Sequence, residues 1–176
     1  QNYSNDLGTI FFATAFDFKS ADFLQNLDVP AFKIASGDLK NLPLINYLAD
    51  FGKPLIISTG GGYQEDIDRV VESLENKKSP YSILQCTAGY PPAWNELNLG
   101  VISTLRSKFP NPVIGFSSHD NGIAMSVAAY ALGARIIEKH FTLNRTLKGT
   151  DHAFSLEPQG LSKLVRDLDR LHVALG

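Results

Sequence analysis

The chain of 176 residues is 44% hydrophobic, which supplies enough apolar side chains for one compact domain with its own core. Its formal net charge of −2, its pI near 6.1 and the lack of a Lys/Arg cluster argue against nucleic acid as a partner, because nucleic-acid binding depends on neutralising phosphates. No apolar run is long enough to cross a membrane, and the single cysteine, Cys86, excludes an internal disulfide and indicates a reducing, cytoplasmic location.

Short β-branched or aromatic runs alternate with amphipathic stretches along the whole chain. The six runs that we predict as strands begin near Ile10, Phe32, Pro54, Tyr81, Val113 and Arg135. Apolar spacing predicts helices between or after these strands at 21–27, 44–49, 64–77, 123–132 and 159–175. The helix at 123–132 is apolar nearly all round, so we expect it to be the most buried of these helices.

Six consecutive βα units of roughly 20 to 30 residues each indicate a parallel sheet covered by helices. A doubly wound open sheet and a (β/α)8 barrel share this pattern. Polar residues recur at the carboxyl end of every predicted strand, which favours the barrel, because a barrel collects its site from all strand ends. The sequence has no Gly-x-Gly-x-x-Gly loop, and the glycines at 60–62 are too generic to indicate a dinucleotide site.

The predicted units are two fewer than a closed eight-stranded barrel needs. Residues 1–8 have the character of a helix end followed by a turn, so the chain does not start as a barrel domain would. We therefore expect residues 1–176 to form a partial (β/α)8 TIM-type barrel that lacks the first two βα units of a longer protein. Such a fragment is expected to be inactive alone, because the missing strands would add contacts to the substrate.

Two histidines, His119 and His140, each end an apolar, strand-like run. They are 140 − 119 = 21 residues apart, which is about one strand, one helix and the return. If the two runs are neighbouring parallel strands, both imidazoles project from the same rim, about 4.8 Å apart. Neutral imidazole is the commonest protein ligand of metals, so the pair suggests a divalent ion. The alternative is a pair of hydrogen-bonded rim histidines without a metal.

Lys33 interrupts an apolar strand, and burying an ammonium group is costly unless an anion accompanies it. The anion is either a bound ligand or a carboxylate of the chain, for which Asp38 and Glu138 are the candidates. Short hydroxyl side chains also stand at strand ends and could bind an anion with Lys33. These are Thr14, Ser36, Ser58 and Ser117. Taken alone, hydroxyl residues of this kind more often cap strands than bind ligands.

Motifs along nearly the whole chain resemble, in the same order, those of the sialic acid synthases, the phosphoenolpyruvate-dependent N-acetylneuraminate synthase family. The matching segments are 12–17, 33–38, 52–54 with 57–60, 86–87 with 90–91, 115–119, 137–142, and 149–152 with 155–158. The resemblance implies a (β/α)8 barrel, usually followed by a small antifreeze-like domain that these 176 residues do not contain. It implies a transferase that condenses phosphoenolpyruvate with an N-acetylmannosamine-type sugar, an N-acylated hexosamine. The product would be a sialic or other nonulosonic acid for surface polysaccharide biosynthesis, and the full-length enzyme would be a homodimer.

The resemblance also assigns roles to individual residues. It implies that His119 and His140 hold Mn²⁺ or Mg²⁺, which would polarise the aldehyde oxygen of the sugar. It implies that Asp38 is the catalytic carboxylate, and that Tyr90 and Asp151 contact the sugar. The groups that would bind phosphoenolpyruvate are Thr14, Lys33, Ser36, Ser58 and Ser117.

Three positions depart from the pattern of the family. Asp38 stands where the family usually has Glu, and Ala88 stands where an Asn commonly contacts substrate. Ser118 replaces the Asp that usually precedes the first metal histidine, and Asp120 on the other side is a candidate substitute. These departures keep two alternatives open: a related barrel aldolase or sugar-acid synthase acting on another aldehyde, and a catalytically weakened barrel that binds a sugar phosphate.

Overall fold

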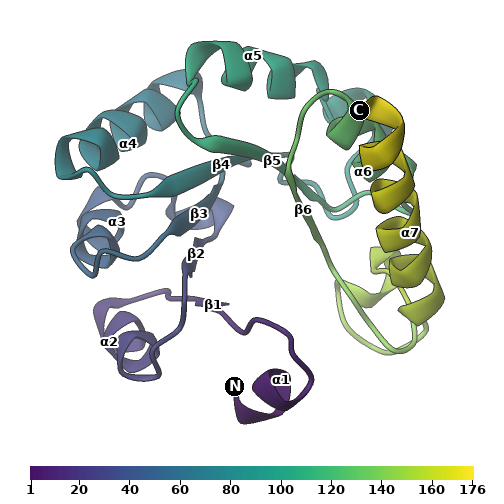
Figure 1. Ribbon diagram of the computed structural model, residues 1–176, viewed down its shortest axis with the longest axis horizontal. Helices are drawn as coiled ribbons and strands as arrows, with labels where there is room; N and C mark the ends of the chain where they lie inside the picture. The colour runs from purple at the N-terminus through teal and green to yellow at the C-terminus, as the bar shows by residue number, and fades with distance from the viewer. The chain divides into compact units, whose positions relative to one another are not determined.

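The computed structural model describes all of residues 1–176, and the chain divides into two compact units, residues 1–82 and residues 83–176. Both units alternate strands with helices, as the sequence predicts (Figure 1). None of the helices combines the length and the apolar character that crossing a bilayer requires.

The first unit is built on three parallel strands that pair in chain order, with Ala13 opposite Phe32 and Phe32 opposite Leu55. Its elements in chain order are α1 (Asn2–Asp6), β1 (Ala13–Thr14), α2 (Phe18–Asn26), β2 (Phe32–Ile34), the 3-10 helix η1 (Ser36–Asp38), α3 (Leu42–Ala49), β3 (Leu55–Ser58) and α4 (Gln64–Lys77). Strands β2 and β3 are buried along almost their whole length, which is typical of a parallel sheet covered by helices.

Two helices of the first unit begin earlier than their apolar spacing predicts, because a polar side chain caps each of them. The Asp17 carboxylate accepts the backbone N–H of Ser20 at 2.7 Å and so caps α2. The Asn41 side chain accepts the backbone N–H of Leu44 at 3.4 Å and caps α3 in the same way. The helices therefore start at residues 18 and 42 instead of 21 and 44.

The second unit contains the strands that carry both histidines. The strand β4 (Tyr81–Cys86) begins at the boundary of the units, and the following elements are η2 (Trp94–Glu96), α5 (Gly100–Lys108), β5 (Val113–Ser118), α6 (Ala124–Ala131), β6 (Ile136–Lys139), η3 (His152–Phe154) and α7 (Pro158–Leu175). Strands β5 and β6 are parallel, with Gly115 opposite Ile136 and Ser118 opposite Lys139. The chain thus reaches both histidines at the same end of neighbouring strands.

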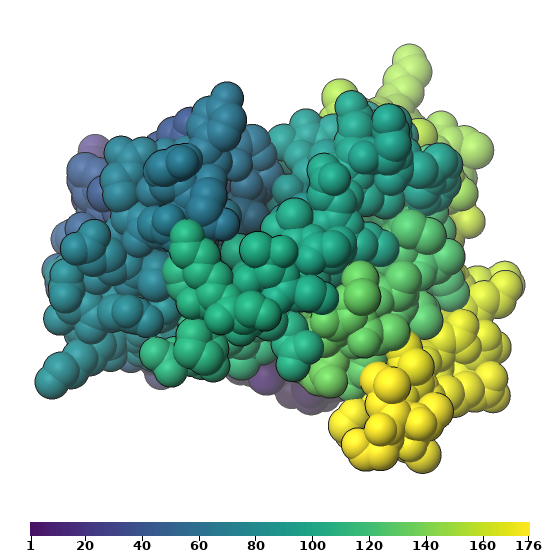
Figure 2. All heavy atoms as spheres, turned by 90° about the horizontal axis from the view of Figure 1, so that it is seen from above, coloured from purple at the N-terminus to yellow at the C-terminus, as the bar shows by residue number.

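The helix α6 packs against α7 and β5, and Figure 1 shows α7 running beside it. Only Ser126 and Ala129 of α6 are buried, whereas α4 buries five of its residues. The expectation that this helix is the most buried is therefore wrong. Its apolar character comes largely from alanines, which leave little apolar area in water on the side that nothing covers. The C-terminal end of α7 lies at the surface in Figure 2, where Val173 and Leu175 are exposed.

Gly115 of β5 lies where the packing leaves no room for a side chain. A Cβ atom there would lie 2.7 Å from the carbonyl oxygen of Ile136 and 2.9 Å from the side chain of Leu84. We expect Gly115→Ala to lower the free energy of unfolding of the full-length protein by about 1–3 kcal/mol, because overpacking displaces backbone. Urea unfolding followed by circular dichroism measures this. The control is Gly100→Ala, whose Cβ meets nothing within 4 Å and which should not destabilise. Equal unfolding midpoints for the wild type and Gly115→Ala would contradict the expectation.

Candidate active site

The structure brings His119 and His140 together at the carboxyl ends of β5 and β6. Each histidine directly follows its strand, and the residues just before them, Ser118 and Lys139, are register partners in the parallel pair. The centroids of the two imidazole rings are 5.1 Å apart and the ring planes are inclined by 73°. This is the convergence that the spacing of the two histidines predicts.

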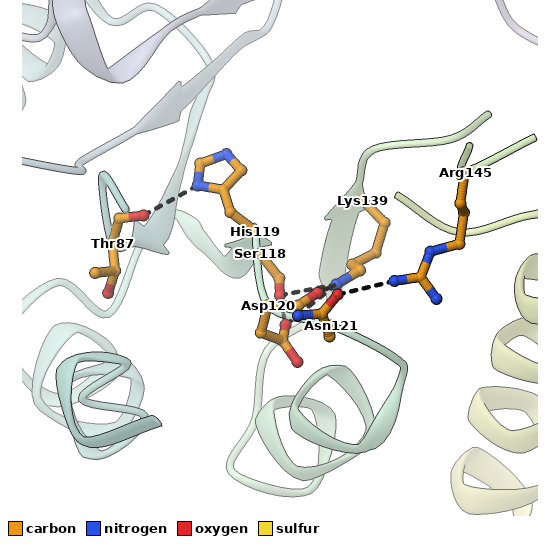
Figure 3. A network of polar contacts seen from close by, with 7 residues as sticks. All are labelled: Thr87, Ser118, His119, Asp120, Asn121, Lys139 and Arg145. Atoms are coloured by element: carbon orange, nitrogen blue, oxygen red, sulfur yellow. Dashed lines mark hydrogen bonds and ion pairs between the residues drawn. The ribbon is translucent and has the colours of Figure 1, made fainter. Parts of the chain in front are cut away.

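An oxygen atom of another residue lies near the Nδ1 atom of each imidazole. The Nδ1 of His119 lies 3.0 Å from the carbonyl oxygen of Thr87 (Figure 3), and the Nδ1 of His140 lies 3.5 Å from a carboxylate oxygen of Asp151. Because a carbonyl oxygen can only accept, the Nδ1 of His119 carries a proton, so in the neutral imidazole it is Nε2 that keeps the lone pair. This arrangement, with Nδ1 held and Nε2 available, is typical of histidines that bind metals.

Aromatic side chains enclose the two imidazoles. The ring of Tyr90 stacks on His119 at 4.0 Å between centroids and lies 6.1 Å from His140. The buried ring of Phe154, in η3, lies 5.1 Å from His140. Tyr90 itself is about half exposed, so one side of this aromatic cluster is open to solvent.

The environment moves the pKa values of the two histidines in opposite directions. Burial lowers the pKa of His119, but the hydrogen bonds with the Cys86 thiol and the Thr87 carbonyl together raise it above its ordinary value. Burial and the nearby charge of His119 lower the pKa of His140, and the carboxylate of Asp151 offsets this only in part. His140 is therefore a neutral imidazole at pH 7, which is the state that binds a metal.

A buried polar network lies between the ends of β5 and β6 (Figure 3). The ammonium of Lys139 contacts the carboxylate of Asp120 at 3.1 Å, and it donates to the Asp120 carbonyl at 2.6 Å and to the Ser118 hydroxyl at 3.2 Å. The Ser118 hydroxyl also donates to the Asp120 carboxylate. Asp120 is thus bonded to Ser118, which precedes His119 in the chain, and to Lys139, which precedes His140. Ser117, the residue before this network, is buried in β5.

The first unit gathers a cation and several hydroxyl groups at the carboxyl ends of its strands. Only 9% of the surface of Lys33 is exposed. Its ammonium donates to the Ser58 hydroxyl at 2.8 Å and to the carbonyl of Ile34 at 3.0 Å. Thr14 lies opposite Lys33 in the register of β1 and β2. The Ser36 hydroxyl accepts the N–H of Gly60 at 2.9 Å. A cation beside short hydroxyl donors suits a phosphate or a carboxylate.

Asp38 is the last residue of η1, the 3-10 turn whose first residue is Ser36. Its carboxylate accepts a hydrogen bond from the side-chain amide of Asn41 at 3.3 Å, and it is partly buried. Within the first unit the structure therefore places the sequence-predicted residues Thr14, Lys33, Ser36, Asp38 and Ser58. Within the second unit it places Tyr90, Ser117, His119, His140 and Asp151.

The donor set around the histidines decides which metal ions it could hold. Among the described residues, no group of three or more His, Cys, Asp and Glu side chains is arranged to hold a metal ion by itself. Two imidazole nitrogens are therefore what the chain offers. Such a pair fits an ion such as Mn²⁺, which accepts nitrogen and oxygen donors, if water or substrate oxygens complete its coordination.

Some residues of the site carry no clear signal in the sequence. The Thr87 carbonyl and the Phe154 ring lie beside the histidines because of loop conformation, which local spacing does not predict. The partnership of Asp120 and Lys139 had a weak signal. Each of the two charged residues is the chain neighbour of one of the histidines, so parallel pairing of the strands brings them together.

Comparison with known proteins places the whole chain in a single group. A model of the NeuB family matches residues 1–176. The N-acetylneuraminate-9-phosphate synthase of Homo sapiens is 42% identical over all of this chain and 49% of its own length. The N,N'-diacetyllegionaminic acid synthase of Campylobacter jejuni is 41% identical over 94% of this chain and 50% of its own length. The chain thus spans about half the length of the curated relatives that it matches.

Solved structures agree with this grouping. The N-acetylneuraminic acid (sialic acid) synthetase of Leptospira borgpetersenii, solved in complex with citrate, superposes with a TM-score of 0.96 at 40% identity, covering 99% of this chain and 61% of that one. A phospho-2-dehydro-3-deoxyheptonate aldolase of Thermotoga maritima has a TM-score of 0.83 at 19% identity, covering 99% of this chain and 54% of that one, and shows the fold alone. These likenesses confirm the predicted TIM-type barrel class.

Proposed function

The chain belongs to the NeuB family, and on that premise we propose that the protein condenses phosphoenolpyruvate with an N-acylated hexosamine of the mannosamine type to form a nonulosonic acid. The observation that carries the proposal is the pair of imidazoles at neighbouring strand ends, whose ring centroids are 5.1 Å apart and whose Nδ1 atoms each lie near an oxygen. The names of the relatives support the same class of product, since they include synthases of sialic, legionaminic and pseudaminic acids.

In the proposed reaction, C3 of phosphoenolpyruvate attacks the aldehyde carbon of the open-chain sugar and forms the new carbon–carbon bond. Water adds at C2, and inorganic phosphate leaves. A divalent ion, Mn²⁺ or Mg²⁺, bound by His119 and His140 would supply Lewis acidity at the aldehyde oxygen. Asp38 is the carboxylate that we assign to proton transfer or to activation of the water.

The chain's own residues bind and orient the two substrates in this proposal. Lys33 and Ser58 hold the anionic groups of phosphoenolpyruvate, assisted by Thr14, Ser36 and Ser117. Tyr90 and Asp151 contact the sugar. Because Asp151 also lies 3.5 Å from the Nδ1 of His140, it would orient that imidazole as well as the sugar.

Two further features of the full-length protein belong to the proposal. We place it in the cytoplasm because Cys86 is buried and forms no disulfide, as is usual in proteins of a reducing compartment. We propose a homodimer by likeness to the family, and the use of its product in surface polysaccharide biosynthesis on the same ground.

The full-length protein, incubated with phosphoenolpyruvate and MnCl₂, tests the proposed function. Candidate acceptors are N-acetylmannosamine, its 6-phosphate, and N-acetylglucosamine as a stereochemical control. We expect phosphate release that requires both the metal and one mannosamine-type acceptor, with a nonulosonic acid as the product in mass spectrometry. Turnover with a different aldehyde, such as a pentose phosphate, would instead indicate a related aldolase. Tight binding of a sugar phosphate in calorimetry without any phosphate release would indicate the weakened, ligand-binding barrel.

A further inference from the structure

Lys139 has no hydrogen-bond donor left for a ligand. Its ammonium has three N–H donors, and three acceptors lie within 3.2 Å: the Asp120 carboxylate, the Asp120 carbonyl and the Ser118 hydroxyl. The side chains of Lys139 and Asp120 are 4% and 1% exposed. A lysine next to a site histidine could be taken for a substrate-binding cation, but the geometry excludes this for Lys139.

Lys139 contacts the residues on either side of His119 in the chain and is itself the residue before His140. Ser118 precedes His119 and Asp120 follows it, so Lys139 is bonded on both sides of His119. Lys139 itself directly precedes His140 in the chain. We call Ser118, Asp120 and Lys139 the strand-end clamp. It joins the last residues of β5 and β6 by side chains, at the point where regular strand pairing ends with Ser118 opposite Lys139.

Hydrogen bonds of Arg145 connect the loop that follows β6 to the residue next to the strand-end clamp. The Asn121 side-chain oxygen, next to the strand-end clamp, accepts from the guanidinium of Arg145 at 3.0 Å (Figure 3). The Nε of Arg145 donates to the carbonyl of Ala153 at 2.8 Å. Ala153 lies in η3 beside Phe154, whose ring contacts His140. The surroundings of the two histidines are therefore restrained both at the strand ends and by the loop that follows β6.

Stability alone is a poor explanation for the strand-end clamp. A buried ion pair gains little over well-packed apolar side chains, because removing two charges from water costs about as much as their attraction returns. The other carboxylate oxygen of Asp120 is buried without a hydrogen-bond partner, which adds a further cost. A costly polar group next to a site is understandable if it fixes the geometry of that site.

We propose that Ser118, Asp120 and Lys139 are positioning residues that fix the two imidazoles, of His119 and His140, in the geometry that a metal ion needs. The part that concerns the metal rests on the function proposed above. The part that concerns the imidazoles does not, because the strand-end clamp orients them whether or not a metal is bound.

The test uses the full-length protein and the variants Lys139→Met, Asp120→Asn and the double variant with both changes. The double variant removes both charges at once, so it avoids an uncompensated buried charge and should fold even if the single variants do not. The control is Lys77→Met, which breaks an exposed ion pair with Asp50 far from the histidines in the chain.

The first measurement is independent of metal: the rate at which diethyl pyrocarbonate modifies each histidine, followed by mass spectrometry in EDTA. His119 is buried, so it should react slowly in the wild type and at least about five-fold faster when the strand-end clamp is broken. The exposed His172 of α7 should react equally in all variants and serves as the internal reference.

The second measurement is the Mn²⁺ dissociation constant by calorimetry, well below the unfolding temperature of each variant. We expect it to rise about 10- to 100-fold in the double variant, which is the usual effect of losing groups that orient metal ligands. A residue with a structural role only would lower the unfolding temperature and leave this constant unchanged. Wild-type modification rates together with a wild-type Mn²⁺ constant in the double variant would overturn the proposal. If the wild type binds no Mn²⁺, the proposed function fails, and the modification rates alone decide on the strand-end clamp.

Discussion

Replacing His119 or His140 by alanine is expected to lower metal-dependent phosphate release by the full-length protein about 10³-fold or more. The reason is that the Lewis acidity of a bound ion is worth several kcal/mol in the transition state, and each 1.4 kcal/mol is a factor of ten in rate. Residues 1–176 contain no cluster of three or more metal-binding side chains, so we expect one remaining imidazole to bind the proposed ion much more weakly than two.

The fold should survive either substitution. His119 makes hydrogen bonds with the Thr87 carbonyl and the Cys86 thiol, and His140 is only half-buried beside Asp151. Losing such bonds costs about 1 kcal/mol each, which is within the stability of a typical enzyme. Circular dichroism spectra and melting temperatures close to those of the wild type would show that the loss of turnover comes from the site.

A matched histidine and a chelator complete the test. His172→Ala removes an exposed imidazole of α7 whose partner is the Tyr130 hydroxyl, and it should leave turnover unchanged. Wild-type protein treated with EDTA should fall to the residual rate of the two site variants, and added Mn²⁺ should restore only the wild type. Full turnover in both His119→Ala and His140→Ala would refute the assignment of these residues to a metal.

The order of the strands and of most helices follows from the sequence because two signals agree, but α5 (Gly100–Lys108), which buries only Ile102 and Leu105, is not among the predicted helices. Apolar runs of strand length alternate with stretches of helical spacing, and polar residues gather at the strand ends. The helix starts were less accurate, because the caps Asp17 and Asn41 extend α2 and α3 beyond their apolar residues. The burial of α6 was overestimated, since spacing reveals which residues are apolar but not which of them a neighbour covers.

For the candidate site too, the spacing of residues in the sequence predicts some features, and side-chain packing determines others. The convergence of His119 and His140 follows from parallel strand pairing, so their position in the sequence was enough. The partners of Lys33 are specified less well, because the sequence leaves open a bound anion or the carboxylates of Asp38 and Glu138, and it does not predict that the Ser58 hydroxyl and the Ile34 carbonyl also accept from its ammonium. Side-chain contacts between residues far apart in the chain depend on rotamers that a pattern of residue types does not specify.

The Lys33→Met substitution is expected to raise the KM for phosphoenolpyruvate about 10- to 100-fold, since a charge-assisted hydrogen bond to an anion is worth about 1.5–3 kcal/mol. Methionine has a similar length and no charge, so it keeps the packing around β2. The KM for the sugar should change by less than about two-fold, because Lys33 is assigned to the other substrate. Initial rates with each substrate varied at saturation of the other give both constants.

The stability of the same variant separates ligand binding from a structural ion pair. If Lys33 serves a bound anion, the ligand-free Lys33→Met protein should be as stable as the wild type, because it no longer buries an ammonium. If Lys33 instead forms a structural ion pair with Asp38 or Glu138, removing it should destabilise the protein by about 3–5 kcal/mol, and adding Asp38→Asn or Glu138→Gln, whichever is the partner, should restore much of the loss. Lys53→Met, which breaks the surface pair with Asp28, is the control and should affect neither KM. A change in the KM of the sugar alone would show that Lys33 has been assigned to the wrong substrate.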